Sequence, residues 1–192
     1  MPPPGVPSAS GAVRPVAPLI VLAAALALLA SGCGGSKSAE EQFADSVCTS
    51  VGEWQDAVDS SVNSVRAQIN SPTPGMVASI NTEIQSAVDA TKKLTSDLKS
   101  IDPPNTDEGK KAKQELVSLN TQLDQTVTKT KQTVAGLSAG AGVAEIVQTL
   151  GTLVPSLQTL ATSASNTISS IQASSQKLKD GFDSAKSCKQ FR

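Results

Sequence analysis

The sequence contains no histidine and no tyrosine, and aromatic residues make up only 2% of the chain. Without histidine there is no Ser-His-Asp or Cys-His catalytic arrangement, no histidine-ligated haem and none of the usual zinc or copper sites. The Glu-x-x-His pairs of four-helix di-iron proteins are excluded for the same reason. We therefore expect a protein that is not an enzyme, has no catalytic residues and uses no metal or cofactor.

Other reactive motifs are also missing. Gly136, Gly140 and Gly142 follow no predicted strand and lack the Lys and Ser/Thr of a phosphate-binding loop, and no EF-hand loop is present. Two acidic groups could in principle hold calcium or perform acid-base chemistry. Both fall at predicted helix starts or in a loop, where acids cap helices and favour the helix dipole. These groups are Glu40-Glu41 with Asp45, and Asp102 with Asp107 and Glu108.

The chain also lacks a strong charge of either sign. Arg14 is the only charged residue among the first 32, which leaves 15 Lys and Arg against 17 Asp and Glu in the remainder. No basic field is present to attract nucleic acid or anionic lipid head groups. We therefore expect no nucleic-acid partner.

The N-terminal region has the pattern of an export signal. Residues 1–14 are proline-rich with one positive charge, and an apolar run of about 15 residues extends from Val16 to Ala30. That length is typical of the hydrophobic core of a signal peptide and is short for a membrane-spanning helix. The run ends at Ala30-Ser31-Gly32-Cys33, where small residues precede a cysteine.

This arrangement resembles the lipobox of bacterial lipoproteins, with Ala30 where leucine is usual. The resemblance implies removal of residues 1–32 and lipidation of Cys33, and so a protein anchored to the outer face of the cell membrane. Residues 33–38 would then be a flexible tether and residues 39–192 the folded domain. The alternatives are an ordinary cleaved signal with an unmodified Cys33, or an uncleaved anchor. The whole chain is similar to small helical lipoproteins of actinobacterial type.

Cysteine parity agrees with this interpretation. Three cysteines are an odd number for an exported protein, but lipidation of Cys33 leaves Cys48 and Cys188 as a pair. An oxidising exterior favours a disulfide between them. The alternative is two separate buried thiols.

The mature part has the apolar spacing of helices. Apolar residues recur at steps of three and four, which predicts amphipathic helices. The first segment runs from about Ala39 to Asn70 and ends before Pro72, and the second carries a heptad seam from Val77 to Ile101. Thr106 or Asn105 can cap a third segment, which the glycines at 136, 140 and 142 close, and a fourth segment starts at Val143.

The fourth segment is too long to be one helix in such a bundle. Segments one to three would each span roughly 45 Å, whereas an unbroken helix from Gly142 to Cys188 would span roughly 70 Å and carry Cys188 past Cys48. Proline breaks helices, so we expect a break near Gly151-Pro155, with a piece of about ten residues before it and a long helix after it. The fold predicted is all-α: an antiparallel up-down bundle of about four helices, packed like a coiled coil.

Two features of the predicted bundle bear on function. Trp54 is interpreted as a packing anchor, the alternative being a ligand-stacking ring. The fourth segment carries only Glu145 as a charge between Lys131 and Lys177. We expect it to be the most buried helix; the alternative is a membrane-lying or self-associating surface.

Three functions remain. The first is a non-enzymatic helical module of the cell envelope, which presents a helical face to an envelope protein or has a structural role. The second is a carrier of an apolar small molecule or lipid, which a roomy cavity lined by Leu150, Leu153, Leu157 and their neighbours would favour. The third, far less favoured, is an enzyme that uses carboxylates only.

Overall fold

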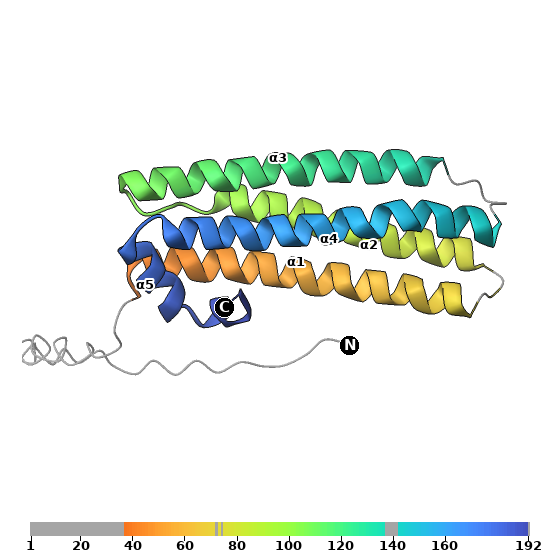
Figure 1. Ribbon diagram of the computed structural model, residues 1–192, viewed down its shortest axis with the longest axis horizontal. Helices are drawn as coiled ribbons and strands as arrows, with labels where there is room; N and C mark the ends of the chain where they lie inside the picture. The colour runs from red at the N-terminus through yellow and green to blue at the C-terminus, as the bar shows by residue number, and fades with distance from the viewer. Residues whose placement is uncertain (1–36, 72, 74, 137–141, 192) are drawn as a thin grey trace, which may run out of the picture. The chain divides into compact units, whose positions relative to one another are not determined.

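The computed structural model of the protein describes residues 37–71, 73, 75–136 and 142–191. The lipidation site Cys33, the cleavage point after Gly32 and residues 33–36 of the predicted tether lie outside these residues. Over the described residues the structure is helical and contains no strand (Figure 1). The elements are α1 (Ala39–Asn70), α2 (Met76–Ser100), α3 (Asp107–Ala135), α4 (Val143–Ala173), α5 (Gln176–Ser184) and the 3₁₀ helix η1 (Lys186–Phe191).

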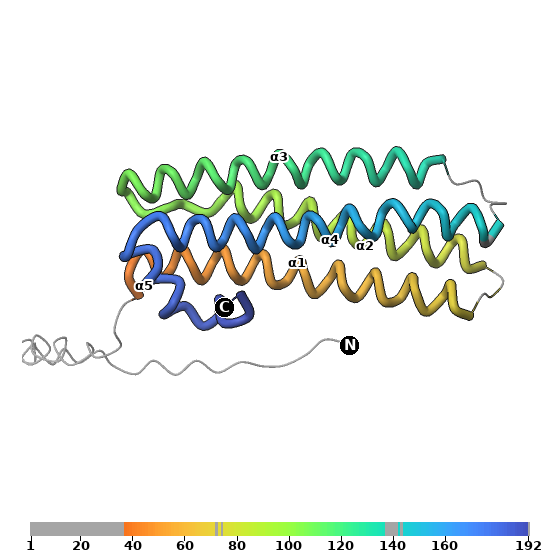
Figure 2. The backbone as a smooth tube through the Cα atoms, in the orientation of Figure 1, coloured from red at the N-terminus to blue at the C-terminus, as the bar shows by residue number. Residues whose placement is uncertain are grey.

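The four long helices form an antiparallel up-down bundle. Each packs on the next along the chain, and α4 returns to lie beside α1, as the backbone trace shows (Figure 2). α5 and η1 cover the end of the bundle at which α1 begins (Figure 1). The predicted all-α up-down bundle is therefore confirmed.

Local capping signals explain where the helices begin. The Ser38 hydroxyl accepts a hydrogen bond from the Glu41 N–H at 3.0 Å, and the Thr106 hydroxyl accepts one from the Gly109 N–H at 3.0 Å. Of the two caps proposed for the third segment, Thr106 is the one used. α2 begins after Gly75, whose φ of 88° lies in the left-handed region that glycine adopts without strain.

The predicted apolar stripes face the interior. In α2, all the seam residues except Val77 are buried, and Val77 is half-buried. The buried apolar side chains form two clusters. The larger lies at the α5 end and contains Trp54, Leu94, Leu119 and Phe182, whereas the smaller lies towards the opposite end and contains Ile80 and its neighbours.

The predicted break at Gly151-Pro155 is wrong. α4 continues through Pro155 without interruption, and the predicted short piece before Gly151 is its first turns. Apolar side chains on both sides of the proline, including Leu153 and Leu160, are buried in the bundle. Their packing holds the two halves of α4 in line, although the proline removes one backbone hydrogen bond.

The chain turns instead at Ser174-Ser175, about twenty residues later. Ser175 has extended backbone angles, and its hydroxyl accepts a hydrogen bond from the Leu178 N–H at 3.2 Å, which starts α5. With 31 residues, α4 is about as long as α1 with 32. The length of the fourth segment thus correctly predicted that it must be broken. The position of the break was wrong, because α4 crosses the whole bundle before the chain turns back.

α4 is also not the most buried helix, contrary to expectation. Among the described residues, α1 contributes more buried side chains than α4. Val147 of α4 is 45% exposed. Within the described part of the chain, no helix has both the length and the apolar character needed to cross a membrane.

Candidate functional site

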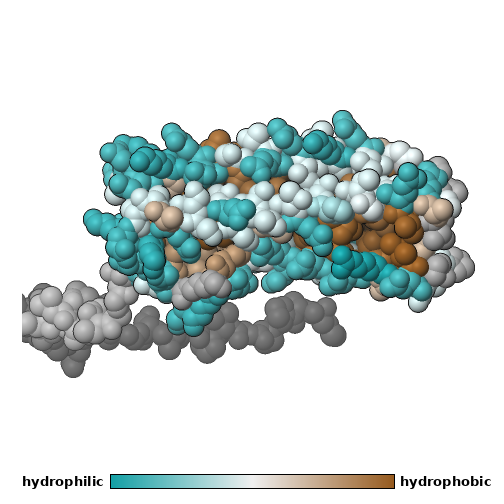
Figure 3. Space-filling model, viewed as in Figure 1, coloured by the Kyte–Doolittle hydropathy of each residue, from teal (hydrophilic) through white to brown (hydrophobic). Residues whose placement is uncertain are grey.

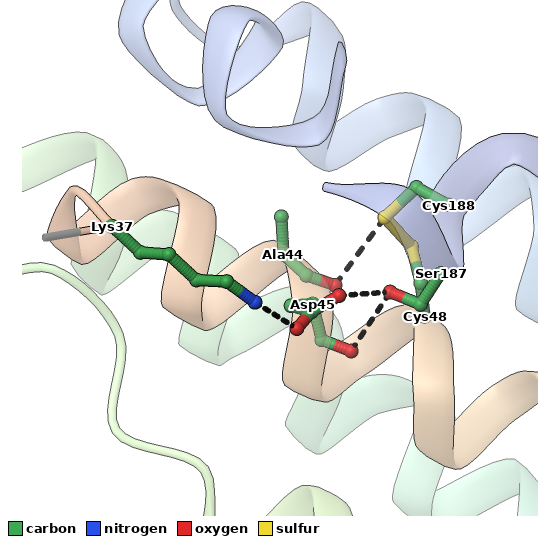
Figure 4. Close-up of a disulfide and its surroundings, with 6 residues drawn as sticks. All are labelled: Lys37, Ala44, Asp45, Cys48, Ser187 and Cys188. Carbon is green, nitrogen blue, oxygen red and sulfur yellow. Dashed lines mark hydrogen bonds and ion pairs between the residues drawn. A yellow bond between two sulfur atoms is a disulfide. The ribbon is translucent and has the colours of Figure 1, made fainter. Parts of the chain in front are cut away.

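A disulfide ties the end of the chain to its first helix. The sulfur atoms of Cys48 in α1 and Cys188 in η1 are 2.08 Å apart and their Cα atoms are 5.0 Å apart (Figure 4). Both residues are completely buried, and Cys188 Sγ lies 3.4 Å from the carbonyl oxygen of Ala44. The two cysteines predicted to pair are therefore brought together, with Cys188 in a 3₁₀ helix rather than in a long final helix.

Asp45 strengthens the same junction. Its carboxylate accepts hydrogen bonds from the Ser187 hydroxyl and from the Lys37 ammonium, both at 2.6 Å (Figure 4). The hydrogen bond from Lys37, followed by that from Ser187, lowers the pKa of the Asp45 carboxyl, and the same carboxylate raises the pKa of Lys37. This contact could not be predicted from the sequence, because Asp45 and Ser187 are far apart in the chain.

Aromatic and small residues close the α5 end. The rings of Phe43 and Phe182 meet edge to face with centroids 6.2 Å apart. At Gly181 of α5 an added Cβ would lie within 2.8 Å of the Glu40 backbone, so only glycine allows α5 to approach α1 this closely. These contacts and the disulfide hold α5 and η1 against α1, so this end of the bundle has a structural role.

Trp54 is placed as a packing anchor. Only 2% of its surface is exposed, and its indole N–H donates a hydrogen bond to the Thr91 hydroxyl at 3.0 Å. Thr91 in turn donates to the Ala87 carbonyl oxygen at 2.7 Å. The ring is therefore buried, and its N–H group has a hydrogen-bond partner.

The acidic groups include residues in the first turns of helices, where the helix dipole favours negative charge. Glu40 and Glu41 are in the first turn of α1, and Asp107 and Glu108 are in the first turn of α3. Across the described residues, no set of three or more Asp, Glu or Cys side chains is close enough together to hold a metal ion.

An apolar cleft lies between the helices, in the half of the bundle away from the disulfide. All four long helices line it, and its lining includes members of both core clusters. Its enclosed space is about 30 Å³, and its free volume is about 480 Å³ when the part open to solvent is counted. α4 contributes Leu150, Leu153, Val154 and Leu157, which include the three leucines named from the sequence.

Small side chains opposite these leucines leave the space. α1 presents Ser61 and Val62, and α2 presents Ala87 and Thr91, all of which are smaller than leucine. The sequence pattern did not reveal this, because alanine, threonine and leucine all satisfy an apolar stripe. The cleft thus arises where small residues of two helices face large residues of a third.

The polar part of the lining is confined to a few side chains. Glu83 of α2 and Thr126 of α3 are half-buried, and they come from neighbouring helices. Glu83 is the only charged side chain of the lining, and no cation among the described residues forms an ion pair with it. Almost all of the surface that these residues present to the cleft is apolar, so the chemistry of the cleft suits an apolar group.

No protein family model, curated protein or solved structure matches this chain.

Proposed function

We propose that this chain is a lipoprotein anchored through Cys33 to the outer face of the cell membrane, where it binds other molecules and catalyses no reaction. The signal pattern that ends at Cys33 supports the anchor. The folded part then acts as a helical interaction or structural module of the cell envelope.

An exposed apolar surface supports an interaction role. Hydrophobic surface gathers at the end of the bundle away from α5 (Figure 3). Val147 of α4 is 45% exposed among the described residues at this end. Apolar surface of this kind is typical of protein interaction sites. A protein of the envelope is the partner that we propose for it.

Native mass spectrometry of the protein purified from its own cell membranes tests this function. We expect a mature chain that begins at a lipidated Cys33 and a complex with one defined envelope protein. Val147→Glu should reduce that complex at least several-fold, because it replaces an exposed apolar side chain near the start of α4 with a charge. Val117→Glu is the matched control, since Val117 of α3 is similarly exposed at 53%. An unmodified Cys33 would refute the anchor, and a complex that is absent or insensitive to Val147→Glu would refute the interaction role.

The cleft favours a second candidate, a carrier of an apolar molecule. Leu150, Leu153 and Leu157 line it as expected, but its enclosed space of about 30 Å³ is not the roomy cavity that the carrier hypothesis calls for. A ligand of ordinary size therefore requires the helices to separate. In the same spectra, a co-purifying apolar compound would support the carrier, and a bare chain would count against it.

A further inference from the structure

A polar groove runs between α3 and α4 at the surface of the bundle. Its volume of about 440 Å³ lies in the range typical of small-molecule sites, whereas the interior cleft encloses far less. Six of its nine lining residues are serine or threonine. We propose that this groove binds one acidic sugar unit, a ring that carries several hydroxyls and one carboxylate. This site is separate from the surface and the cleft on which the proposed functions depend.

Most of the hydroxyls in the groove act as hydrogen-bond acceptors. Five of them donate their proton to a carbonyl oxygen of their own helix at 2.7 to 2.9 Å, so they present only lone pairs to the groove. A ligand must therefore bring several O–H or N–H donors. These five hydroxyls belong to Thr126, Thr133, Thr152, Ser156 and Thr159.

The sixth hydroxyl, that of Thr130, is buried and unpartnered. Only 4% of the surface of Thr130 is exposed, and its hydroxyl has no hydrogen-bond partner among the described residues. Thr130 lines both the groove and the interior cleft, and the surface of that cleft is almost wholly apolar. The hydroxyl therefore lies on the side of the groove. A buried hydroxyl without a partner is unfavourable, so a ligand group that bonds to it gains free energy.

The groove carries a positive charge. Lys129 is part of its lining and forms no ion pair with any described residue. No carboxylate of the described residues lines the groove. Gln132 adds an amide that can donate as well as accept. The groove therefore favours an anion and has no group to pair with a cation.

An acidic sugar matches both properties of the lining. Its hydroxyls can donate to the serine and threonine oxygens, and its carboxylate can pair with the Lys129 ammonium. The carbon face of its ring can pack on Leu153 and on the threonine methyl groups. An inorganic anion brings too few donors for those oxygens, and an aliphatic chain brings none.

Saturation-transfer difference NMR, which observes the ligand, tests this proposal on the purified full chain in detergent micelles. The probes are glucuronate, glucose and glucosamine, which share a sugar ring and carry a negative charge, no charge and a positive charge. We expect glucuronate to bind about two- to five-fold more tightly than glucose, because an exposed charge pair contributes little. Glucosamine should bind more weakly than glucose. Empty micelles give the background signal.

A charge variant tests the selection of the anion. Lys129→Gln should make glucuronate and glucose bind equally, because it removes the cation of the groove. Lys131→Gln is the matched control, since Lys131 is exposed on the same helix outside the groove lining, and it should preserve the preference for glucuronate.

A hydroxyl variant locates the binding. Thr130→Val should weaken the binding of both sugars several-fold without lowering the thermal unfolding midpoint, because it removes only an unpartnered hydroxyl. Thr128→Val is the control, since Thr128 is exposed on the same helix and its hydroxyl donates to the Asp124 carbonyl oxygen at 2.9 Å. It should leave sugar binding unchanged. Should Thr130→Val fail to fold, Ser156→Leu at an exposed position of α4 blocks the groove instead.

Three results would overturn the proposal. The first is that none of the probes binds to the parent. The second is that glucose or glucosamine binds as tightly as glucuronate. The third is binding that persists in Thr130→Val or in Ser156→Leu, which would place the sugar elsewhere on the molecule. None of these results bears on the anchor or the interaction role, which are tested at Cys33 and Val147.

Discussion

At the level of single residues, Asp45 links three parts of the chain. It belongs to α1, and its carboxylate holds the Ser187 hydroxyl of the C-terminal segment and the Lys37 ammonium that precedes α1. It also lies one turn before Cys48. The junction therefore combines a covalent bond with a charge-assisted hydrogen-bond network.

We predict that Asp45→Asn lowers the free energy of unfolding at neutral pH by up to about 1 kcal/mol, because the network is partly exposed to solvent. The pKa of Asp45 is lowered in the folded state, so its stabilisation is present above the ordinary carboxyl pKa and is lost as the pH falls through the lowered value. Urea denaturation at neutral and acid pH measures this. The difference between variant and parent should shrink in acid.

Asp56→Asn is the control for this measurement, because Asp56 is exposed on the same helix. It should have a smaller effect at neutral pH. Equal stability of the parent and Asp45→Asn at every pH would contradict the role given to the network.

Single residues differed in how far the sequence could predict them. Cys48 and Cys188 were predicted as a pair by parity alone. Trp54 was predicted as a packing residue, since it is the largest side chain on the stripe of α1. Asp45 and Ser187 were not predicted as partners, because polar contacts between distant segments depend on where the chain turns, and that turn was placed wrongly.

At the level of helices, α4 shows packing overriding a local signal. Pro155 is exposed on α4, and the Ser156 hydroxyl donates to the Thr152 carbonyl oxygen at 2.9 Å beside it. The cost of the proline is met by the burial of apolar residues on both sides. Ser175, which does start a new helix, stands in a serine-rich stretch where its capping role could not be distinguished from the sequence.

We predict that Pro155→Ala raises the free energy of unfolding by about 1 to 3 kcal/mol, because alanine restores the missing hydrogen bond of an exposed helix position. Thermal unfolding measures the change. Gly151→Ala, one turn earlier, is the comparison: an added Cβ there meets nothing within 4 Å, and it should raise stability by about 0.5 to 1 kcal/mol.

A fall in stability for Pro155→Ala, with Gly151→Ala behaving as expected, would contradict the view that the proline weakens α4. By contrast, the bounds of α1 were predicted closely. They are fixed by strong local signals, the Ser38 cap and the prolines that follow Ser71 in the sequence, which packing does not oppose.

At the level of the whole molecule, the disulfide joins residues 140 apart in the sequence. We predict that Cys48→Ala with Cys188→Ala lowers the free energy of unfolding by about 2 to 5 kcal/mol, because the unfolded chain is no longer closed into a large loop. Urea denaturation under non-reducing conditions measures this. Limited proteolysis should cut the double variant first in η1 and α5, which the bond holds against α1.

Reducing agent added to the parent in urea should reproduce the loss, whereas it should leave the double variant unchanged. If neither the double substitution nor reduction of the parent changed the urea midpoint, packing alone would hold the C-terminal segment against α1.

The overall fold was predictable and the cleft was predictable only in part. The spacing of the apolar residues, the turn residues and the segment lengths were enough to predict four antiparallel helices. The leucines of α4 were recognised as candidate lining residues, but the cleft also depends on Ser61, Ala87 and Thr91 lying opposite them. Which layers of a bundle face one another follows from three-dimensional register, and apolar spacing does not specify that.

The position of the disulfide also determines how the fold would respond to mechanical load. A pull between the start of α1 and the end of η1 travels through only about the first three turns of α1, crosses the sulfur bridge and leaves through the last residues of η1. The long loop between the two cysteines, which holds the cleft, would bear none of that force. Stretching the chain by its ends therefore leaves the interior of the bundle relaxed.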